Sequence, residues 1–305
     1  MPPRLIAIDL DGTLLDPTGH VSPRNRAALQ LAESAGIEIV ISTGRRHSFA
    51  MHVLRDLNLN PHSALVSSNG TVIRTINAQL IHRTHMPLHT ARWLCSALDP
   101  YRNTLVLTFD LTNPDGEDSQ GALVVQHLDD LHASIGRWMQ SNQRYIAHVD
   151  RLEDVLRPGQ NPPIQMMLCG AVDRMAEAEA LLNQHPLVTS IGDTPSPTHE
   201  VALHRTTYPE TDLTLLDILP AGCSKASALQ HLATLRGIST NDILAIGDNW
   251  NDLAMLRLAG SAALMSNAPD DLKSLARTSG WTIAPSNSED GVAVAIEAAL
   301  AGVPA

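Results

Sequence analysis

Two aspartates near the start of the chain are the side chains best placed for chemistry. Asp9 and Asp11 stand two residues apart, directly after the apolar run 5–8, which predicts a buried strand. Residues i and i+2 of a strand point to the same side, so we expect both carboxylates to reach one crevice at the strand's carboxyl end. Paired carboxylates repel each other unless a cation offsets their charge. The pair therefore predicts a site for a hard divalent cation such as Mg²⁺, which prefers oxygen ligands.

Further polar groups follow later predicted strands or begin a predicted helix. They comprise a hydroxyl, two carboxylates, an amide and an ammonium: Thr43, Asp248, Asp252, Asn251 and Lys225. The carboxyl ends of parallel strands meet at one edge of a sheet, where ligands bind. A phosphoryl group under attack needs an oxygen nucleophile, a cation, hydrogen-bond donors and a proton source. This set of residues therefore predicts a phosphoryl-transfer site.

The predicted elements that would position these groups alternate between strand and helix. Strands are predicted at 5–9, 37–41, 64–67, 243–246 and 262–265. Helices are predicted from Ser22-Pro23 to about Gly36, and at 48–57, 225–235, 251–258 and 290–300. Such alternation is typical of an α/β fold with a doubly wound parallel sheet.

The middle of the chain has a different texture. After a predicted hairpin at 72–81, short strand-like runs occur at 104–109, 122–127, 163–169, 187–191 and 200–204, and one helix is predicted at 172–182. We interpret this region as an inserted α+β domain. The predicted organisation is a discontinuous core of residues 1–85 and 218–305, interrupted by an insert of residues 86–217.

Composition narrows the classes of function. With 305 residues, 44% of them hydrophobic, the chain can bury a large core. A net charge of −11 argues against a nucleic-acid partner. Three cysteines without a C-x-x-C motif are typical of a reducing compartment. The apolar run at the start is too short for a signal peptide and no stretch reaches transmembrane length, so we expect a cytoplasmic protein without a membrane partner. No feature predicts an oligomeric state.

Four motifs, in this order, resemble those of Cof-type phosphatases of the haloacid dehalogenase (HAD) superfamily, which carry a class IIB cap. The motifs are DLDGT at 9–13, STGR at 42–45, Lys225, and GDNWND at 247–252. The segments SSNG at 67–70, ILP at 218–220, SNA at 266–268 and EDGV at 289–292 are also similar to that subfamily. The similarity covers the whole core. It implies a HAD Rossmann-like core, with the insert as a cap domain that determines substrate specificity.

The resemblance implies different roles for the two opening aspartates. Asp9 would be the nucleophile that forms an aspartyl-phosphate. Asp11 would protonate the leaving alcohol and then deprotonate the attacking water. The implied Mg²⁺ ligands are the carboxylates of Asp9 and Asp248 and the backbone carbonyl of Asp11.

The resemblance also implies which groups bind the phosphoryl oxygens. These would be Thr43, the amide of Gly44, Lys225 and Asn251, while Asp252 would orient Lys225 or a metal-bound water.

Three residues have open or unusual roles. Arg45 could stabilise its loop by an ion pair or touch the substrate. Trp250 stands where a small or acidic residue is common, and we expect simple packing rather than contact with the cap or substrate. Ser266 replaces the usual glycine before Asn267, which would alter a backbone turn because glycine permits conformations that serine disfavours.

The resemblance implies a Mg²⁺-dependent phosphatase of small phosphorylated metabolites, with sugar phosphates as the foremost class. A phosphomutase acting on sugar phosphates is an alternative on the same fold. A receiver-like signalling protein is another alternative. The lysine of this chain argues against it, because it lies more than 200 residues after the acidic pair, across the inserted domain. A binding protein without catalysis is the last alternative, and the intact motifs argue against it.

Overall fold

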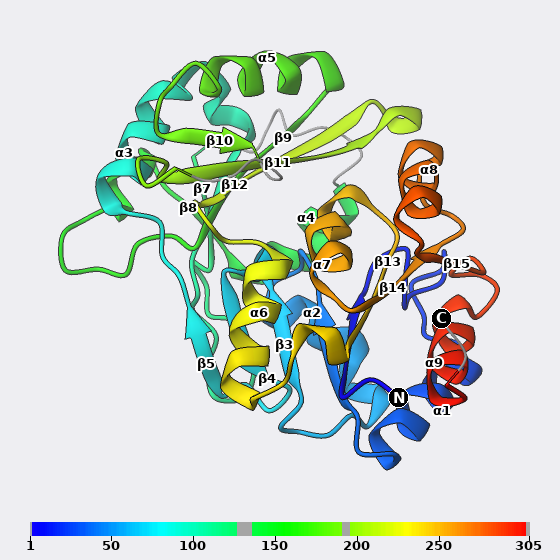
Figure 1. Cartoon of the computed structure of the whole chain (residues 1–305). Helices are drawn as coiled ribbons and strands as arrows, with labels where there is room; N and C mark the ends of the chain where they lie inside the picture. The colour runs from blue at the N-terminus through cyan, green and yellow to red at the C-terminus, as the bar shows by residue number, and fades with distance from the viewer. Residues whose placement is uncertain (1, 127–135, 191–195, 303–305) are drawn as a thin grey trace. The chain divides into compact units, whose positions relative to one another are not determined.

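The chain folds into two compact units in a computed structural model that describes residues 2–126, 136–190 and 196–302 (Figure 1). The first unit is Met1–His82 with Ser224–Ala305, and the second is Arg83–Cys223. The sequence placed the insert at 86–217 instead. The later boundary moves because strand β12 (Leu213–Pro220) pairs with β11 (Val201–Tyr208) as far as Pro220. Residues 218–220 therefore belong to the second unit's sheet and do not begin the core.

The first unit contains an eight-stranded sheet in the order β15-β14-β13-β1-β2-β3-β4-β5. The strands are β1 (Leu5–Asp9), β2 (Glu38–Ser42), β3 (Ala64–Ser67), β4 (Val72–Thr75), β5 (Leu80–Arg83), β13 (Ile243–Gly247), β14 (Ser261–Met265) and β15 (Thr282–Ala284). From β15 to β3 the neighbours run parallel, and β4 returns antiparallel. The predicted doubly wound α/β core is confirmed, with β1 at its centre.

Helices cover both faces of this sheet. Buried apolar residues join one face to α1 (Pro23–Ser34), α2 (His47–Leu54) and α9 (Gly291–Leu300). The other face packs against α6 (Lys225–Arg236), α7 (Leu253–Leu258) and α8 (Asp270–Ser279). Alternate residues of a strand share a face, so Asp9 follows Leu5 and Ala7 toward the side that α6 covers. That parity brings Asp9 to the helix that begins with Lys225.

Local capping fixes where α6 begins. The Ser224 hydroxyl accepts from the backbone N–H of Ser227, and the Ser227 hydroxyl accepts from the N–H of Ser224. This capping box satisfies N–H groups that a helix leaves unpaired at its start. Lys225 is thereby held at the first helical position.

The second unit contains a seven-stranded sheet in the order β10-β11-β12-β9-β6-β7-β8. Its other strands are β6 (Leu105–Thr108), β7 (Leu123–Val125), β8 (Ile146–His148), β9 (Gln165–Gly170) and β10 (Val188–Ser190). One face packs against α3 (Leu88–Ala97) and α5 (Val172–Leu182). The predicted α5 is confirmed. Residues 127 and 191, which end two predicted runs, lie outside the described residues.

Several short elements were not predicted from the sequence. They are α3, α4 (Gly136–Asn142), α8, β8 and β15. Two predicted helices are also shorter than expected: residues 55–57 after α2 and 250–252 before α7 form 3₁₀ turns. Helices and strands of this length owe their form mainly to tertiary packing, which local periodicity does not carry.

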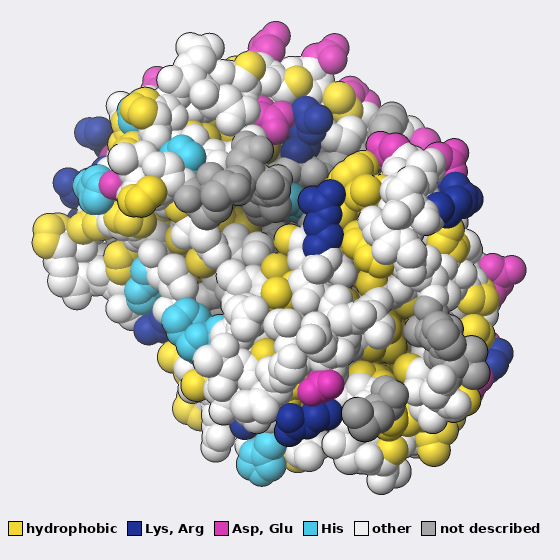
Figure 2. Space-filling view, in the orientation of Figure 1, with side chains coloured by type: hydrophobic (Ala, Val, Ile, Leu, Met, Phe, Trp, Pro, Cys, Tyr) yellow, Lys and Arg dark blue, Asp and Glu magenta, His cyan; other side chains and the backbone are white. Residues whose placement is uncertain are grey.

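No helix in the described parts of the chain combines the length and apolar character needed to cross a bilayer. On the face drawn in Figure 2, the described Lys and Arg side chains stand in separate places among acidic and neutral groups.

Candidate active site

A buried lysine lies between two carboxylates at the carboxyl end of β1. The Lys225 ammonium donates to Asp9 Oδ1 and to Asp252 Oδ1, the latter at 2.7 Å. Lys225 is 1% exposed, Asp9 4% and Asp252 0%. A buried ammonium is costly unless it is paired. The two carboxylates supply that pairing for Lys225.

The turn after β13 adds the remaining carboxylates. Asp252 Oδ2 accepts from the backbone N–H groups of Asp248 and Asn249, each at 3.1 Å. The Asp248 carboxylate lies beside it and accepts from the Thr13 hydroxyl at 2.9 Å. Asp252 therefore ties the turn to Lys225 and fixes where Asp248 stands.

Burial and mutual repulsion disturb the protonation of this cluster. The pKa of Asp9 lies well above its ordinary value because of burial and the charge of Asp252, although Lys225 acts in the opposite direction. Burial, with the charge of Asp252, raises the pKa of Asp248 to about 7. Burial alone would lower the pKa of Lys225, but Asp252 and Asp9 raise it above its usual range. Both carboxylates are unfavourable as anions without a further positive charge.

The donor set fits a divalent metal. Asp9, Asp248 and Asp252 each offer a carboxylate oxygen, and these oxygens lie within 4.8 Å of one another. Three carboxylates against one ammonium leave two negative charges uncompensated. A hard dication with oxygen ligands would balance them. The Asp252 oxygens already bind Lys225 and two backbone N–H groups, so Asp9 and Asp248 are the better placed ligands.

Asp11 has a different environment from Asp9. Strand β1 ends at Asp9, so the strand alternation expected from the sequence does not extend to Asp11. Arg45 binds the Asp11 carboxylate with two hydrogen bonds, Nε to Oδ2 at 2.8 Å and a terminal nitrogen to Oδ1 at 2.5 Å. The Asp11 side chain is 56% exposed. Of the two roles left open for Arg45, the structure contains the ion pair.

The remaining predicted residues lie at the ends of the neighbouring strands. Thr43 follows Ser42, which pairs with Asp9 across β1 and β2. Thr43 is fully buried, and its hydroxyl accepts from the N–H of Arg45 at 3.1 Å, whereas Gly44 is exposed. Asn251 is partly buried in the 3₁₀ turn before α7. Within the described chain, no hydrogen bond joins the Thr43 hydroxyl or Asn251 to the aspartates.

Trp250 occupies the same 3₁₀ turn as Asn251. It is 40% exposed. Its backbone N–H donates to the Asn249 side chain, which caps the turn.

Two further neighbours of Asp248, like Thr13, had no role assigned from the sequence. Asn267 donates to the Gly12 carbonyl at 2.9 Å and to Asp248 Oδ2 at 3.4 Å. Gly12 adopts a φ of +80°, and a Cβ there would lie 2.4 Å from Asp248 Oδ2. Glycine is thus required both by the backbone and by the closeness of Asp248. The DLDGT motif contained the signal for Gly12, whereas the contact of Asn267 spans the whole chain.

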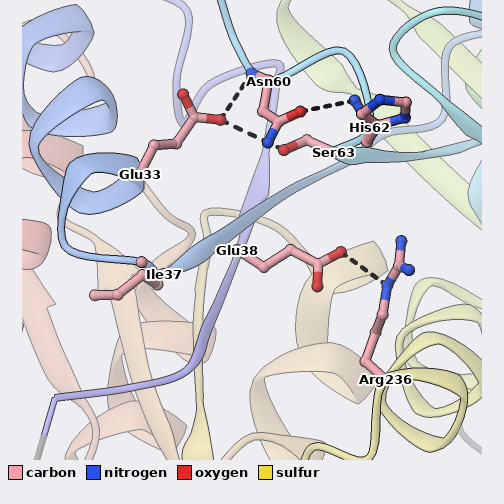
Figure 3. Close-up of a pocket in the computed structure, with 8 residues that line it drawn as sticks. Glu33, Ile37, Glu38, Asn60, His62, Ser63 and Arg236 are labelled. Carbon is pink, nitrogen blue, oxygen red and sulfur yellow. Dashed lines mark hydrogen bonds and ion pairs between the residues drawn. The ribbon is translucent and has the colours of Figure 1, made fainter.

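A separate hollow of about 330 Å³ opens at the amino end of β2, where Glu38 is the first residue. In Figure 3, Glu33 turns toward Asn60 and Ser63, and Glu38 toward Arg236. Its carboxylates are thus engaged by protein donors. Among the described residues, only Asp9, Asp248 and Asp252 form a cluster able to hold a metal. The aspartate cluster is therefore the candidate active site.

Comparison with protein families and known sequences identifies the family of the chain. Residues 6–296 match the model of a family described as haloacid dehalogenase-like hydrolase. A 5-amino-6-(5-phospho-D-ribitylamino)uracil phosphatase of Bacillus subtilis strain 168 is 32% identical over 312 residues, covering 98% of this chain and 99% of that protein. An HMP-PP phosphatase of Escherichia fergusonii is 26% identical over 270 residues, covering 88% and 86%.

Solved structures share the fold. A haloacid dehalogenase-like hydrolase from B. subtilis has a TM-score of 0.74 at 24% identity, over 96% of this chain and 99% of that one. A hydrolase of the same description from Bacteroides thetaiotaomicron has a TM-score of 0.73 at 24% identity, over 97% and 98%. At this identity the likeness extends to the fold alone.

Proposed function

The chain belongs to the haloacid dehalogenase-like hydrolases, and we propose that it is a Mg²⁺-dependent phosphatase that hydrolyses small phosphomonoesters through an aspartyl-phosphate. The observation that carries the proposal is the buried set Asp9, Lys225, Asp252 and Asp248 at the carboxyl ends of β1 and β13. It supplies a nucleophile, a fixed positive charge and metal ligands together. The relatives named above are phosphatases.

Asp9 acts as the nucleophile. Lys225 holds Oδ1, and within the described residues Oδ2 accepts no hydrogen bond, so one oxygen is free. A carboxylate oxygen attacks phosphorus, a new P–O bond forms, and the bond to the leaving oxygen breaks. Lys225 remains beside the reacting group, where its charge offsets the charge on the phosphoryl oxygens. Asp252 keeps the ammonium in that place through its 2.7 Å bond.

Asp11 moves the protons. Its protonated carboxyl gives a proton to the leaving alkoxide, so that the alcohol departs neutral. The resulting carboxylate accepts a proton from water as the water attacks phosphorus, and the bond to Asp9 breaks to release inorganic phosphate. Asp11 must turn out of its ion pair with Arg45 to do this, and its exposure leaves it free to move.

Asp9, Asp248 and the Asp11 carbonyl are the residues assigned to Mg²⁺. When bound, the ion neutralises negative charge on the phosphoryl oxygens and on the carboxylates. Thr43, the Gly44 amide and Asn251 are assigned to the phosphoryl oxygens. We assign selection of the leaving alcohol to the second unit, with sugar phosphates as the foremost class.

Turnover of p-nitrophenyl phosphate by purified protein tests the function. We expect release of p-nitrophenol with Mg²⁺, loss of activity with EDTA, and recovery when Mg²⁺ is restored. A panel of phosphorylated metabolites then identifies the preferred class. Absence of turnover throughout the panel in the presence of Mg²⁺ would contradict the proposal and favour a binding protein.

Product analysis separates the hydrolase from the phosphomutase. A hydrolase releases one inorganic phosphate for each ester consumed. A mutase returns the phosphoryl group to another hydroxyl, so the ester is isomerised and little phosphate appears. A sugar phosphate with a second free hydroxyl is the substrate to use.

A further inference from the structure

We propose that the turn Ser68–Gly70 is a positioning element that aims the Gly44 N–H at the phosphoryl group, with Asn69 as its key residue. This inference rests on the proposed function, because it deepens the role of the Thr43–Gly44 loop. The turn follows β3 and has three consecutive residues with positive φ: Ser68 at 49°, Asn69 at 53° and Gly70 at 99°. Residues with a Cβ rarely adopt this conformation. A strained and buried turn beside a reactive loop is a candidate for a functional role.

The turn grips the backbone on both sides of Gly44. The Asn69 N–H donates to the Thr43 carbonyl at 3.1 Å, and the Ser68 N–H donates to the Arg45 carbonyl at 2.9 Å. Both donors can reach these carbonyls because the left-handed turn presents two successive N–H groups to one loop. Relaxing Asn69 to negative φ would turn its N–H away from Thr43.

Holding the Thr43 carbonyl fixes the direction of the Gly44 N–H. A peptide unit is planar and trans, so its N–H points opposite to its C=O. With the Thr43 carbonyl directed at Asn69, the Gly44 N–H must point away from the turn. Gly44 is exposed, and its N–H donates to no acceptor within the described residues. An N–H that points outward and has no acceptor within the described residues is the kind of donor that an oxyanion site needs.

The Asn69 side chain adds a second constraint on the same peptide. Asn69 is 5% exposed. A Cβ built on Gly44 would lie 3.1 Å from Asn69 Oδ1 and 3.3 Å from Nδ2, so the amide packs directly against the glycine. Any rotation of the Thr43–Gly44 peptide must therefore displace Asn69.

The far side of the turn meets the start of α6. A Cβ on Gly70 would lie 2.1 Å from the Ser224 carbonyl oxygen and 3.1 Å from the Lys225 nitrogen. The turn is thus in close contact with the loop that carries Gly44 and with the helix that carries Lys225. It sets the spacing of two groups assigned to the phosphoryl oxygens.

Asn69→Ala tests the proposal, with Asn58→Ala as a matched control. Alanine disfavours the left-handed region, so the turn should relax and release the Thr43 carbonyl. We expect kcat for p-nitrophenyl phosphate to fall about tenfold and the Ki of inorganic phosphate to rise about tenfold. Asn58 has a φ of 53° at the far end of α2 from Thr43, and its alanine variant should lower Tm while kcat and Ki stay unchanged. Equal losses of Tm with unchanged kcat and Ki for Asn69→Ala would overturn the proposal.

A double-variant cycle covers the case in which Asn69→Ala fails to fold. Gly44→Ala adds a methyl group that crowds the Asn69 amide, and we expect about a tenfold loss of kcat. Asn69→Gly keeps the left-handed backbone and removes the crowded amide, so the pair Gly44→Ala and Asn69→Gly should recover most of that loss. Independent effects in the double variant would refute the packing argument.

The same set of proteins separates this proposal from the proposed function. Turnover by the unaltered protein decides whether it is a phosphatase. Calorimetric binding of inorganic phosphate with Mg²⁺ present reports on the Gly44 donor even without turnover. An unchanged phosphate Kd in Asn69→Ala, with wild-type binding measurable, would overturn the role of the turn alone.

Discussion

Each unit contains a network of charged side chains, and the two networks affect carboxylate pKa values in opposite directions. In the first unit, Lys225 is buried among three carboxylates, and the pKa of Asp248 rises to about 7. In the second unit, Arg102 makes three hydrogen bonds to carboxylates, two to Glu153 and one to Asp99. Its hydrogen bonds lower the pKa of Glu153 to about 2. The first network has too little positive charge to balance its carboxylates, whereas in the second network the Arg102 guanidinium stabilises them.

The difference supports the proposal that the first network is a reactive site and the second a structural one. Arg102 also donates to Gln126 and to the Cys95 carbonyl, so all of its N–H donors bind acceptors within the protein. The first network keeps carboxylates that the fold does not neutralise. Such an arrangement costs stability and persists where function requires it.

Removing the proposed nucleophile should abolish activity without loss of fold. Asp9→Asn preserves shape, and Lys225 keeps its bond to Asp252. We expect turnover of p-nitrophenyl phosphate to fall at least about 10³-fold, with an unchanged circular dichroism spectrum. Asp16→Asn is the control, because Asp16 caps a local turn through Thr18 and His20 and should retain full activity. Substantial activity in Asp9→Asn would rule out the aspartyl-phosphate.

Removing the cation of the first network should destabilise the protein strongly. Lys225→Met leaves Asp9 and Asp252 buried without their shared partner. Breaking a buried pair in this way costs about 3 to 5 kcal/mol, measured by urea unfolding in EDTA. Lys273→Met is the control, because Lys273 pairs with Asp270, whose side chain is 98% exposed, and such a pair contributes below about 1 kcal/mol. Similar losses in both variants would mean that the first network is an ordinary ion pair.

The two networks also differ in how much of each could be predicted from the sequence. Asp9 and Asp248 stand in short motifs at the ends of predicted strands, and Lys225 begins a predicted helix, so their elements followed from local pattern alone. Arg102 and Glu153 carry no motif, and their pairing depends on how α3 meets the following turns. Asn267 reaches Gly12 across the whole chain. Contacts of this kind are set by tertiary packing, which no local pattern encodes.

The sequence likewise predicted the existence of strands better than the residues at which they begin and end. Alternation from β1 suggested that Asp9 and Asp11 would share a crevice, but the strand ends at Asp9 and Arg45 binds Asp11. Segment 218–220 resembled a lead into Lys225, whereas its pairing with β11 assigns it to the second unit. Pairing partners decide such boundaries, and they are distant in sequence.

Mg²⁺ should stabilise the protein more as pH rises. Without metal, the raised pKa of Asp248 makes the native state bind more protons than the unfolded state between its ordinary value of 3.8 and about 7. Stability from this group therefore falls as pH rises through that range. Mg²⁺ at about 100 times its Kd adds about 2.7 kcal/mol, and the Tm shift that it causes should be larger near about pH 8 than near about pH 5. Asp248→Asn should lose most of the shift. A shift independent of pH would remove Asp248 from the metal site.

Glu153→Gln should have the smallest effect and the opposite dependence on pH. The lowered pKa of Glu153 means that its stabilisation is fully present above its ordinary value of 4.5 and is lost as pH falls toward about 2. The variant should cost about 1 kcal/mol at neutral pH and should lose less stability than wild type on acidification through that range. Its kcat and KM should be unchanged. Acid unfolding of the two proteins, followed side by side, measures the difference, and parallel curves would mean that the Arg102 network does not depend on this carboxylate. An altered kcat would instead place Glu153 in the reaction and erase the contrast between the two networks.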